Sequence, residues 1–237
     1  MKKLFYLAVI MLPLSIVSCS KKDSNGEESN SDSGKIKAVD LGLSVKWASA
    51  NVGASSPWDF GDYYAWGETT PKSDYSTNNY KWYDSYNQYD NYWAVSWIFK
   101  YCCSLYNSIK GAVDMKTVLD PEDDVAHVKL GGKWRMPTKD EMYELVFTRY
   151  KANYEWTWNK GWTITFLENG NSIFLPASGF IDGTWIREVG TGGYCYWTSS
   201  LDEDYSEDAY VLGFNTSGVE VNYMPRREGR SIRAVCD

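Results

Sequence analysis

The sequence predicts an α+β fold made mostly of short antiparallel strands, with two short helices and a long aromatic-rich insertion. Alternating β-branched and apolar residues, separated by Gly and Asn turn signals, recur along most of the chain. Helical periodicity with capping residues is confined to two segments, 120–130 and 138–149. Residues 58–101 contain sixteen aromatic side chains. Because strands and helices are grouped rather than strictly alternating, the pattern indicates α+β rather than a parallel α/β fold.

The N-terminal residues are predicted to be targeting and tether segments outside the fold. Two lysines precede an apolar run at 4–17 that is too short to span a bilayer, which predicts a signal peptide over 1–18. The run ends in Ile-Val-Ser-Cys, which resembles a bacterial lipobox and predicts cleavage before Cys19 and its lipidation. The alternative is an ordinary signal peptide with a chance cysteine. Because residues 20–34 have no apolar side chain, 19–35 are predicted to be the lipidated cysteine and a flexible tether.

The charge of the chain bears on its partners. Removal of the signal peptide leaves 22 basic and 31 acidic residues, a net charge of −9. An acidic surface is repelled by phosphates, so nucleic acid is not an expected partner. The expected contact with a membrane is the lipid anchor, which indicates an outer-membrane lipoprotein of the cell envelope and leaves open which face carries it. Residues 36–237 have the length of one ordinary domain.

Four cysteines remain in that domain, Cys102, Cys103, Cys195 and Cys236. In an oxidising envelope an even number suggests disulfides, and four cysteines allow three pairings. Adjacent cysteines rarely bond each other, so Cys102 and Cys103 would each pair with Cys195 or Cys236 if two bridges form. None of the spacings is typical of a zinc site.

Strand signals run through the domain in order. The segments 36–42, 44–53 and 61–68 mix β-branched, apolar and aromatic residues with Gly breaks. A hairpin is predicted over 162–179, because Asn169-Gly170 supplies a turn that needs positive φ. A second hairpin is predicted from 208–214 and 219–223, and 231–237 is expected to be the last strand.

The two helices carry start signals. Asp120 is predicted to cap the first, with Pro121 in its first turn and Val125, Val128 and Leu130 as its buried stripe. Its acidic residues suit the positive end of the helix dipole. In the second, Thr138 and Glu141 form a T-x-x-E capping box, followed at helical spacing by Met142, Leu145 and Val146.

Several segments recur in an order that resembles a known family. These are "GGKWRMPTKDEMYEL", "FLPASGF", "GGYCYWTSS", "RREGRSIRAVCD" and the N-terminal "AVDLGLSVKWASANVGASSPWDFGDYYAWGE". Together they resemble the Fibrobacter succinogenes major paralogous domain family, in the version common among Bacteroides lipoproteins, over nearly the whole mature chain. The resemblance implies a C-type-lectin-like fold for residues 36–237, akin to that of formylglycine-generating enzymes.

Within that fold most motif residues are expected to be scaffold rather than site. Trp134 and Met136 would face the core on a short strand. Tyr194, Tyr196 and Trp197 would lie in a central strand, with Thr198 and Ser199 beginning a loop. Arg135 and Arg233 are expected to pair with carboxylates.

Catalytic and metal chemistry have little support in the sequence. His127 is the only histidine and lies in a short predicted helix, so a histidine triad is not expected. The acidic residues after Asp120 lack the spacing of a calcium loop, and Lys160 after Trp158-Asn159 departs from the calcium motifs of sugar-binding lectins. No metal and no cofactor are predicted. An oxidase-like enzyme resting on Cys195 and Cys236 is the less favoured alternative, since buried thiols or a disulfide explain the same residues.

The segment after "YWTSS" is the predicted ligand face. In related lectin-like proteins it contacts the ligand, and here it offers a mixture of Tyr, Asn and Asp that is typical of binding surfaces. The alternative is a solvated acidic hairpin. The candidate contact residues are Asp202, Asp204, Tyr205, Tyr210, Asn222, Tyr223 and Arg226.

The aromatic insertion supplies a secondary candidate. Its rings either pack onto the domain or face a ligand, and Trp82, Tyr83 and Tyr86 are the first choices for exposed contacts. Residues 92–109 beyond them are compatible with a helix. The expected function is a non-catalytic, lipid-anchored binding protein for a glycan or a protein; the alternative is a structural or adhesive subunit of a surface assembly. The oligomeric state is left open.

Overall fold

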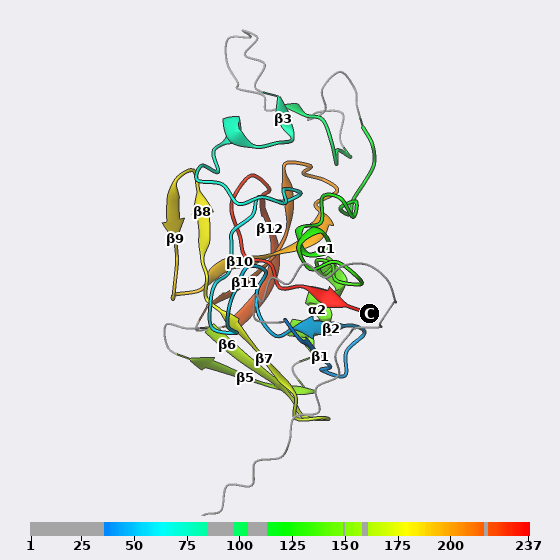
Figure 1. Cartoon of the computed structure of the whole chain (residues 1–237), viewed down its shortest axis with the longest axis vertical. Helices are drawn as coiled ribbons and strands as arrows, with labels where there is room; N and C mark the ends of the chain where they lie inside the picture. Colours follow the sequence, from blue (N-terminus) through cyan, green and yellow to red (C-terminus); the bar gives the residue numbers. More distant parts are fainter. Residues whose placement is uncertain (1–35, 85–96, 104–112, 149, 158–160, 216–217) are drawn as a thin grey trace, which may run out of the picture.

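The computed structural model describes residues 36–84, 97–103, 113–148, 150–157, 161–215 and 218–237 (Figure 1). In these residues thirteen strands form five small antiparallel sheets, together with two α-helices and one 3₁₀ helix, η1 (Thr77–Asn79). The predicted α+β class is confirmed at this level. Cys19 and Tyr86 lie outside the described residues, as do the predicted signal peptide and tether.

The sheet β10–β11–β12 lies at the centre of the molecule (Figure 1). Its strands are β10 (Gly193–Leu201), β11 (Asp208–Asn215) and β12 (Gly218–Pro225). The hairpin predicted around residues 215–218 is confirmed, with Tyr210 opposite Tyr223 and Asn215 opposite Gly218. The strand β10 runs through Thr198 and Ser199, which were expected to begin a loop. Their backbone groups find partners in neighbouring segments, since the Ser199 N–H donates to the Pro137 carbonyl oxygen at 2.7 Å.

Each face of this sheet is buried in a separate hydrophobic core. Trp197 and Val211 point into one core, together with Trp66 and the aromatic rings of the insertion. Tyr196 and Leu212 point into the other. Successive residues of a strand face opposite sides, so one strand contributes to both cores.

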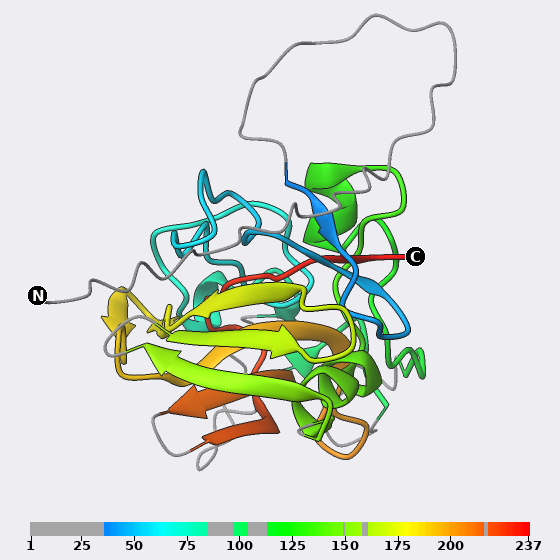
Figure 2. The same ribbon diagram turned by 90° about the horizontal axis from the view of Figure 1, so that it is seen from below.

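The second core is closed by the sheet β5–β6–β7, formed by β5 (Ala152–Thr157), β6 (Gly161–Phe166) and β7 (Ser172–Pro176). Figure 2 shows these three strands side by side, with α2 at one end of them. The predicted hairpin between β6 and β7 is confirmed, and Gly170 has the positive φ of 71° that its turn requires.

The remaining strands are short. The first two described strands and the last form the sheet β1–β2–β13, with β1 (Ala38–Val39), β2 (Lys46–Ala48) and β13 (Val235–Cys236). A hairpin of β8 (Phe180–Asp182) and β9 (Trp185–Arg187) lies at one side of the molecule (Figure 1).

The second helix begins as predicted. In α2 (Lys139–Phe147) the Thr138 side chain accepts from the Glu141 N–H and the Glu141 side chain accepts from the Thr138 N–H, so the capping box is confirmed. Met142, Leu145 and Val146 are buried, as expected for the inner face.

The first helix begins later than predicted. In α1 (Val125–Leu130) the N-cap is Asp124, whose side chain accepts from the His127 N–H, and residues 121–123 form a turn. The buried side chains of this helix are Val125 and Ala126, whereas Val128 is exposed rather than part of a buried stripe. Asp120 is therefore not the cap.

Two other local predictions were wrong. Residues 61–68 form no strand; positive φ at Gly61 and Gly67 interrupts the segment, and only an isolated bridge joins Tyr64 to Arg230. The part of 92–109 that is described is not helical. Its residues Trp97–Ile98 form β4, which pairs with β3 (Tyr83–Asp84), and Tyr101 has a φ of 58° that a right-handed helix excludes.

Three fully buried arginines organise the C-terminal segment: Arg226, Arg230 and Arg233. Arg233 was expected to pair with a carboxylate, but it donates to the Asn51 Oδ1 and to the Ala48 and Phe174 carbonyl oxygens at 2.8–3.1 Å. A guanidinium has five N–H donors, so several uncharged oxygens placed around it can accept its hydrogen bonds in place of a carboxylate. Arg135 does pair with carboxylates, those of Glu141 and Asp237.

The four cysteines of the domain do not form the two disulfides that their even number suggested. Cys195 and Cys103 carry free thiols, and any two-bridge arrangement of four cysteines needs both. The Cys195 thiol lies 3.3 Å from the Gly192 carbonyl oxygen, and burial raises its pKa to about 12. Cys236 lies on β13, which pairs with β2, whereas Cys195 lies on β10 in a different sheet. Cys195 and Cys236 are therefore not on neighbouring strands.

Candidate functional site

Three tyrosines come together at the open end of the β11–β12 hairpin, away from its turn at 215–218. We name Tyr205, Tyr210 and Tyr223 the tyrosine cluster. The Tyr205 and Tyr223 rings are nearly parallel, with centroids 5.9 Å apart and an interplanar angle of 19°. Tyr210 meets Tyr223 edge-on at 6.4 Å. Tyr205 is 57% exposed and Tyr223 is 42% exposed, so both rings offer apolar surface to solvent.

The strand register positions two of these rings. Tyr210 and Tyr223 are directly opposite in the antiparallel pair, so their side chains lie on the same face. That face is the one whose other residues, such as Leu212, enter the second core. The tyrosine cluster therefore continues the buried face of the sheet into solvent.

The third ring is placed by the loop 202–208 between β10 and β11. Asp202 is buried, and its Oδ1 accepts from the Asp204 and Tyr205 N–H groups at 2.9 Å each. The loop closes on itself because the Asp202 N–H donates to the Asp208 carbonyl oxygen and the Asp208 N–H donates to that of Tyr205. Asp202 was predicted to be an exposed ligand contact, and this prediction was wrong. Its carboxylate is buried because it accepts hydrogen bonds from backbone N–H groups of the turn that follows it.

Arg226 was also predicted to contact a ligand, and it is completely buried beneath this loop. One guanidinium nitrogen donates to the Ser206 carbonyl oxygen at 2.9 Å and to that of Tyr101 at 2.8 Å. The others donate to the Lys100 carbonyl oxygen and the Tyr80 hydroxyl at 2.7 and 2.8 Å. Arg226 therefore fixes the loop to the aromatic insertion and touches no solvent.

The start of α2 contributes a residue that sequence reasoning missed. The Lys139 ammonium lies 4.7 Å from the centroid of the Tyr210 ring and 3.9 Å from a carboxylate oxygen of Glu203. Lys139 and Glu203 lie far apart in the sequence, so no local pattern links them. Burial raises the pKa of the Tyr210 hydroxyl, and the nearby Asp202 raises it further, so this phenol stays protonated at neutral pH.

Other predicted contact residues lie elsewhere. The Asn222 amide donates to the Tyr194 hydroxyl at 3.1 Å on the opposite face of the sheet from Tyr223. Trp82 is buried rather than exposed, since its ring packs against Tyr101 and Phe99. Tyr83 is half-buried, edge-on to Tyr80. Of the seven residues predicted on the C-terminal face, the structure brings Asp204, Tyr205, Tyr210 and Tyr223 together around Asp202.

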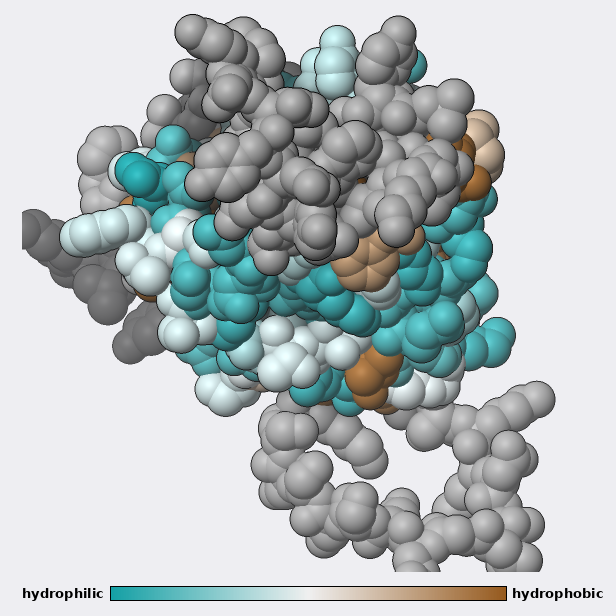
Figure 3. Space-filling view, turned by 90° about the horizontal axis from the view of Figure 1, so that it is seen from above, coloured by the Kyte–Doolittle hydropathy of each residue, from teal (hydrophilic) through white to brown (hydrophobic). Residues whose placement is uncertain are grey.

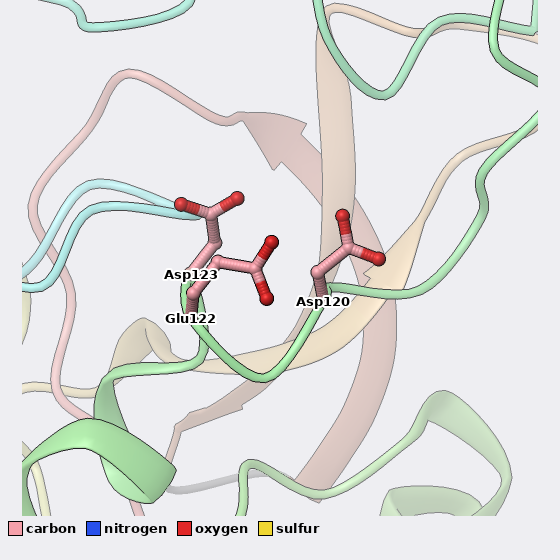
Figure 4. Close-up of side chains that lie close together, drawn as sticks. All are labelled: Asp120, Glu122 and Asp123. Carbon is pink, nitrogen blue, oxygen red and sulfur yellow. The ribbon is translucent and has the colours of Figure 1, made fainter.

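A second cluster of ionisable side chains lies before α1. The carboxylate oxygens of Asp120, Glu122 and Asp123 lie within 4.8 Å of one another, and Figure 4 shows them gathered around one space. Lysine ammonium groups already approach them: Lys100 lies 3.0 Å from Asp120 and also contacts Asp123, and Lys81 lies 3.0 Å from Asp123. Hydrogen bonds from Lys116 and Lys100 lower the pKa of Asp120. The group is therefore an ion-pair network that ties the insertion to the turn before α1.

The carboxyl group of Asp208, at the end of the loop 202–208, is expected to make the stability of the protein depend on pH. Burial, together with Glu207, Asp202 and Glu228, raises the pKa of Asp208 from 3.8 to about 6. Between these values the folded protein keeps a proton that the unfolded chain releases, so the free energy of unfolding falls as the pH rises through that window. We expect Asp208→Asn to raise the free energy of unfolding at pH 7 by about 1–2 kcal/mol and to change it little below about pH 4. Urea titrations at both pH values measure this, and equal stability of the variant and the original protein at pH 7 would contradict it.

Comparison with protein-family models, curated proteins and solved structures found no match. Of the helices in the part of the chain that the structure describes, none is long and apolar enough to cross a membrane.

Proposed function

We propose that this protein is a non-catalytic binding protein that recognises a glycan through the tyrosine cluster. The observation that carries the proposal is the nearly parallel, solvent-exposed pair of rings at Tyr205 and Tyr223. Sugars have apolar ring faces that pack on aromatic rings and hydroxyl edges that bind carboxylate and amide groups. Glu203 and Asp204, both exposed beside the rings, supply such acceptors.

The rigidity of the site supports recognition. Tyrosine has few rotatable bonds, so it gives large contact area at a low entropic cost. The loop that carries Tyr205 is held by its own Asp202 and by the buried Arg226, so little order has to be created on binding.

The wider context of the proposal rests on the sequence. The lipobox at Cys19 and the polar tether indicate a lipid-anchored protein of the outer membrane. The resemblance to the Fibrobacter succinogenes major paralogous domain family implies a C-type-lectin-like fold, in which the segment after "YWTSS" contacts the ligand. The oxidase-like alternative is disfavoured, because a buried Cys195 with a pKa near 12 is a poor nucleophile.

Single substitutions in the tyrosine cluster test the function. In a glycan array with the purified protein, Tyr205→Ala and Tyr223→Ala are each expected to weaken binding about two- to tenfold, since stacking on one ring contributes on the order of 0.5–1.5 kcal/mol. Their melting temperatures should stay close to that of the original protein, because both side chains lie at the surface and neither belongs to a buried core.

The matched control is Tyr150→Ala, which removes a tyrosine outside the cluster that is more exposed than either of these two. It should leave binding unchanged. Binding that survives both cluster substitutions, or no binding across plant, host and bacterial glycans, would contradict the proposal.

A subunit of a surface assembly is the second candidate, and one observation favours it. The β8–β9 hairpin exposes Trp185 (70%) and Ile186, and β9 pairs only with β8 among the described strands. An open strand edge with apolar side chains can accept another chain. However, the coloured part of the face seen from above is mostly hydrophilic, with hydrophobic residues in small separate areas (Figure 3). Mild cross-linking on intact cells separates the candidates, since a reproducible heavy adduct that Trp185→Ser abolishes supports assembly.

A further inference from the structure

The charges around the tyrosine cluster are mostly negative. The loop 202–208 contains five acidic residues and no basic one. Two of them, Glu203 and Asp204, are exposed and lie close enough to the Tyr210 hydroxyl that their negative charges help to raise its pKa, after burial and Asp202. Among the described residues Asp204 has no ion-pair partner, whereas Glu203 lies 3.9 Å from the Lys139 ammonium.

Lys139 shows that an ammonium group can lie against the rings and carboxylates around the tyrosine cluster. Its ammonium lies over the face of the Tyr210 ring at 4.7 Å and close to the Glu203 carboxylate. An ammonium is attracted both by the negative face of an aromatic ring and by a carboxylate. Tyr205 and Tyr223, with the unpaired Asp204 beside them, offer the same two groups to an ammonium that comes from outside the protein.

We propose that the tyrosine cluster selects glycans that carry free amino groups, such as hexosamine units that lack the N-acetyl group; this inference rests on the proposed function. Sugar rings pack on Tyr205 and Tyr223, and the ammonium substituent lies against Asp204 and Glu203. Glycans that carry carboxylate or sulfate groups are repelled by the same two residues. The ring pair of Tyr205 and Tyr223 thus gives affinity for sugars in general. Glu203 and Asp204 give the preference for sugars that carry an ammonium group.

The test compares two oligosaccharides that differ only at nitrogen. The full-length protein is titrated calorimetrically with chitosan hexamer, whose amines are protonated at weakly acidic pH, and with chitin hexamer, whose amines are acetylated. We expect the chitosan hexamer to bind about tenfold more tightly at low salt, because a cation–π contact and an ion pair are added. The difference should shrink as salt is raised, since the added interactions lie at the surface.

Variants assign the preference to its residues. The double variant Glu203→Gln with Asp204→Asn should bind both hexamers equally, and Tyr205→Ala should weaken both. The double variant Glu155→Gln with Glu168→Gln removes two exposed acidic side chains outside the loop, so it controls for the same loss of net charge and should keep the preference. All these side chains are exposed, so the variants should fold.

The outcomes separate the two proposals. Equal affinity of the original protein for both hexamers would overturn the inference and leave the proposed glycan binding intact. Binding of neither hexamer nor of any arrayed glycan would overturn the proposed function and the inference with it. Binding of an oligolysine peptide without either hexamer would identify a basic peptide as the ligand and would also overturn the inference.

Discussion

Replacing Arg226 with methionine is expected to lower the free energy of unfolding by about 3–5 kcal/mol, because several buried acceptors lose their donor and each unsatisfied group costs about 1–3 kcal/mol. The substitution leaves three carbonyl oxygens, those of Lys100, Tyr101 and Ser206, without their donor in a buried place. Methionine fills most of the volume, so the loss reports the hydrogen bonds rather than a cavity. Removal of the guanidinium also removes its contacts with the Trp66 and Tyr80 rings.

The adjacent arginine supplies the control. Arg227 is only half-buried and forms ion pairs with Asp182 and Glu228 at 3.3 and 3.6 Å. Arg227→Met should cost less than about 1 kcal/mol, as is usual for ion pairs near the surface. Urea denaturation followed by tryptophan fluorescence measures both variants. If Arg226→Met unfolded at the same urea concentration as Arg227→Met, the assigned role of Arg226 would be wrong.

A second large effect is expected for Trp197→Ala, about 3–5 kcal/mol, because it removes a completely buried indole at the centre of the first core. The indole N–H donates to the Tyr64 carbonyl oxygen at 2.9 Å, and the Arg230 guanidinium lies over the ring at 5.0 Å. Trp197→Phe keeps most of the apolar contact and loses the donor, so it should cost roughly 1–3 kcal/mol.

Trp185→Ala is the corresponding control on the surface. Its side chain is largely exposed, so the free energy of unfolding should change by no more than about 0.5 kcal/mol. The same urea titrations give all three values. The assignment of Trp197 to the core would fail if Trp197→Ala and Trp185→Ala were equally stable.

Features that depend on neighbours in sequence could be predicted. The turn at Asn169-Gly170 needs only a residue that accepts positive φ, and the capping box of Thr138 and Glu141 needs only its two residues. The hairpin of β11 and β12 was predicted from signals of the same local kind, although its register, with Tyr210 opposite Tyr223, comes from the structure.

Features that depend on distant residues could not be predicted. Arg226 looked like a surface residue because its acceptors lie 20 to 146 positions away in the chain. The contact of Lys139 with Glu203 likewise joins a helix start to a loop that follows a different strand. Asp120 and Asp124 are both acceptable N-caps, and the choice of Asp124 is made by the Met136 N–H, which also donates to its side chain at 2.8 Å.

The three buried arginines make closure of both cores depend on residues 226–233. Segments near Ala48, Tyr64, Lys100 and Ser206 have acceptors whose donors lie between residues 226 and 233. A chain that is synthesised from its N-terminus lacks these donors until residues 226–233 have emerged, so closure of the cores is delayed until then. A chain truncated before Arg226 would leave core side chains exposed and would be more susceptible to proteases.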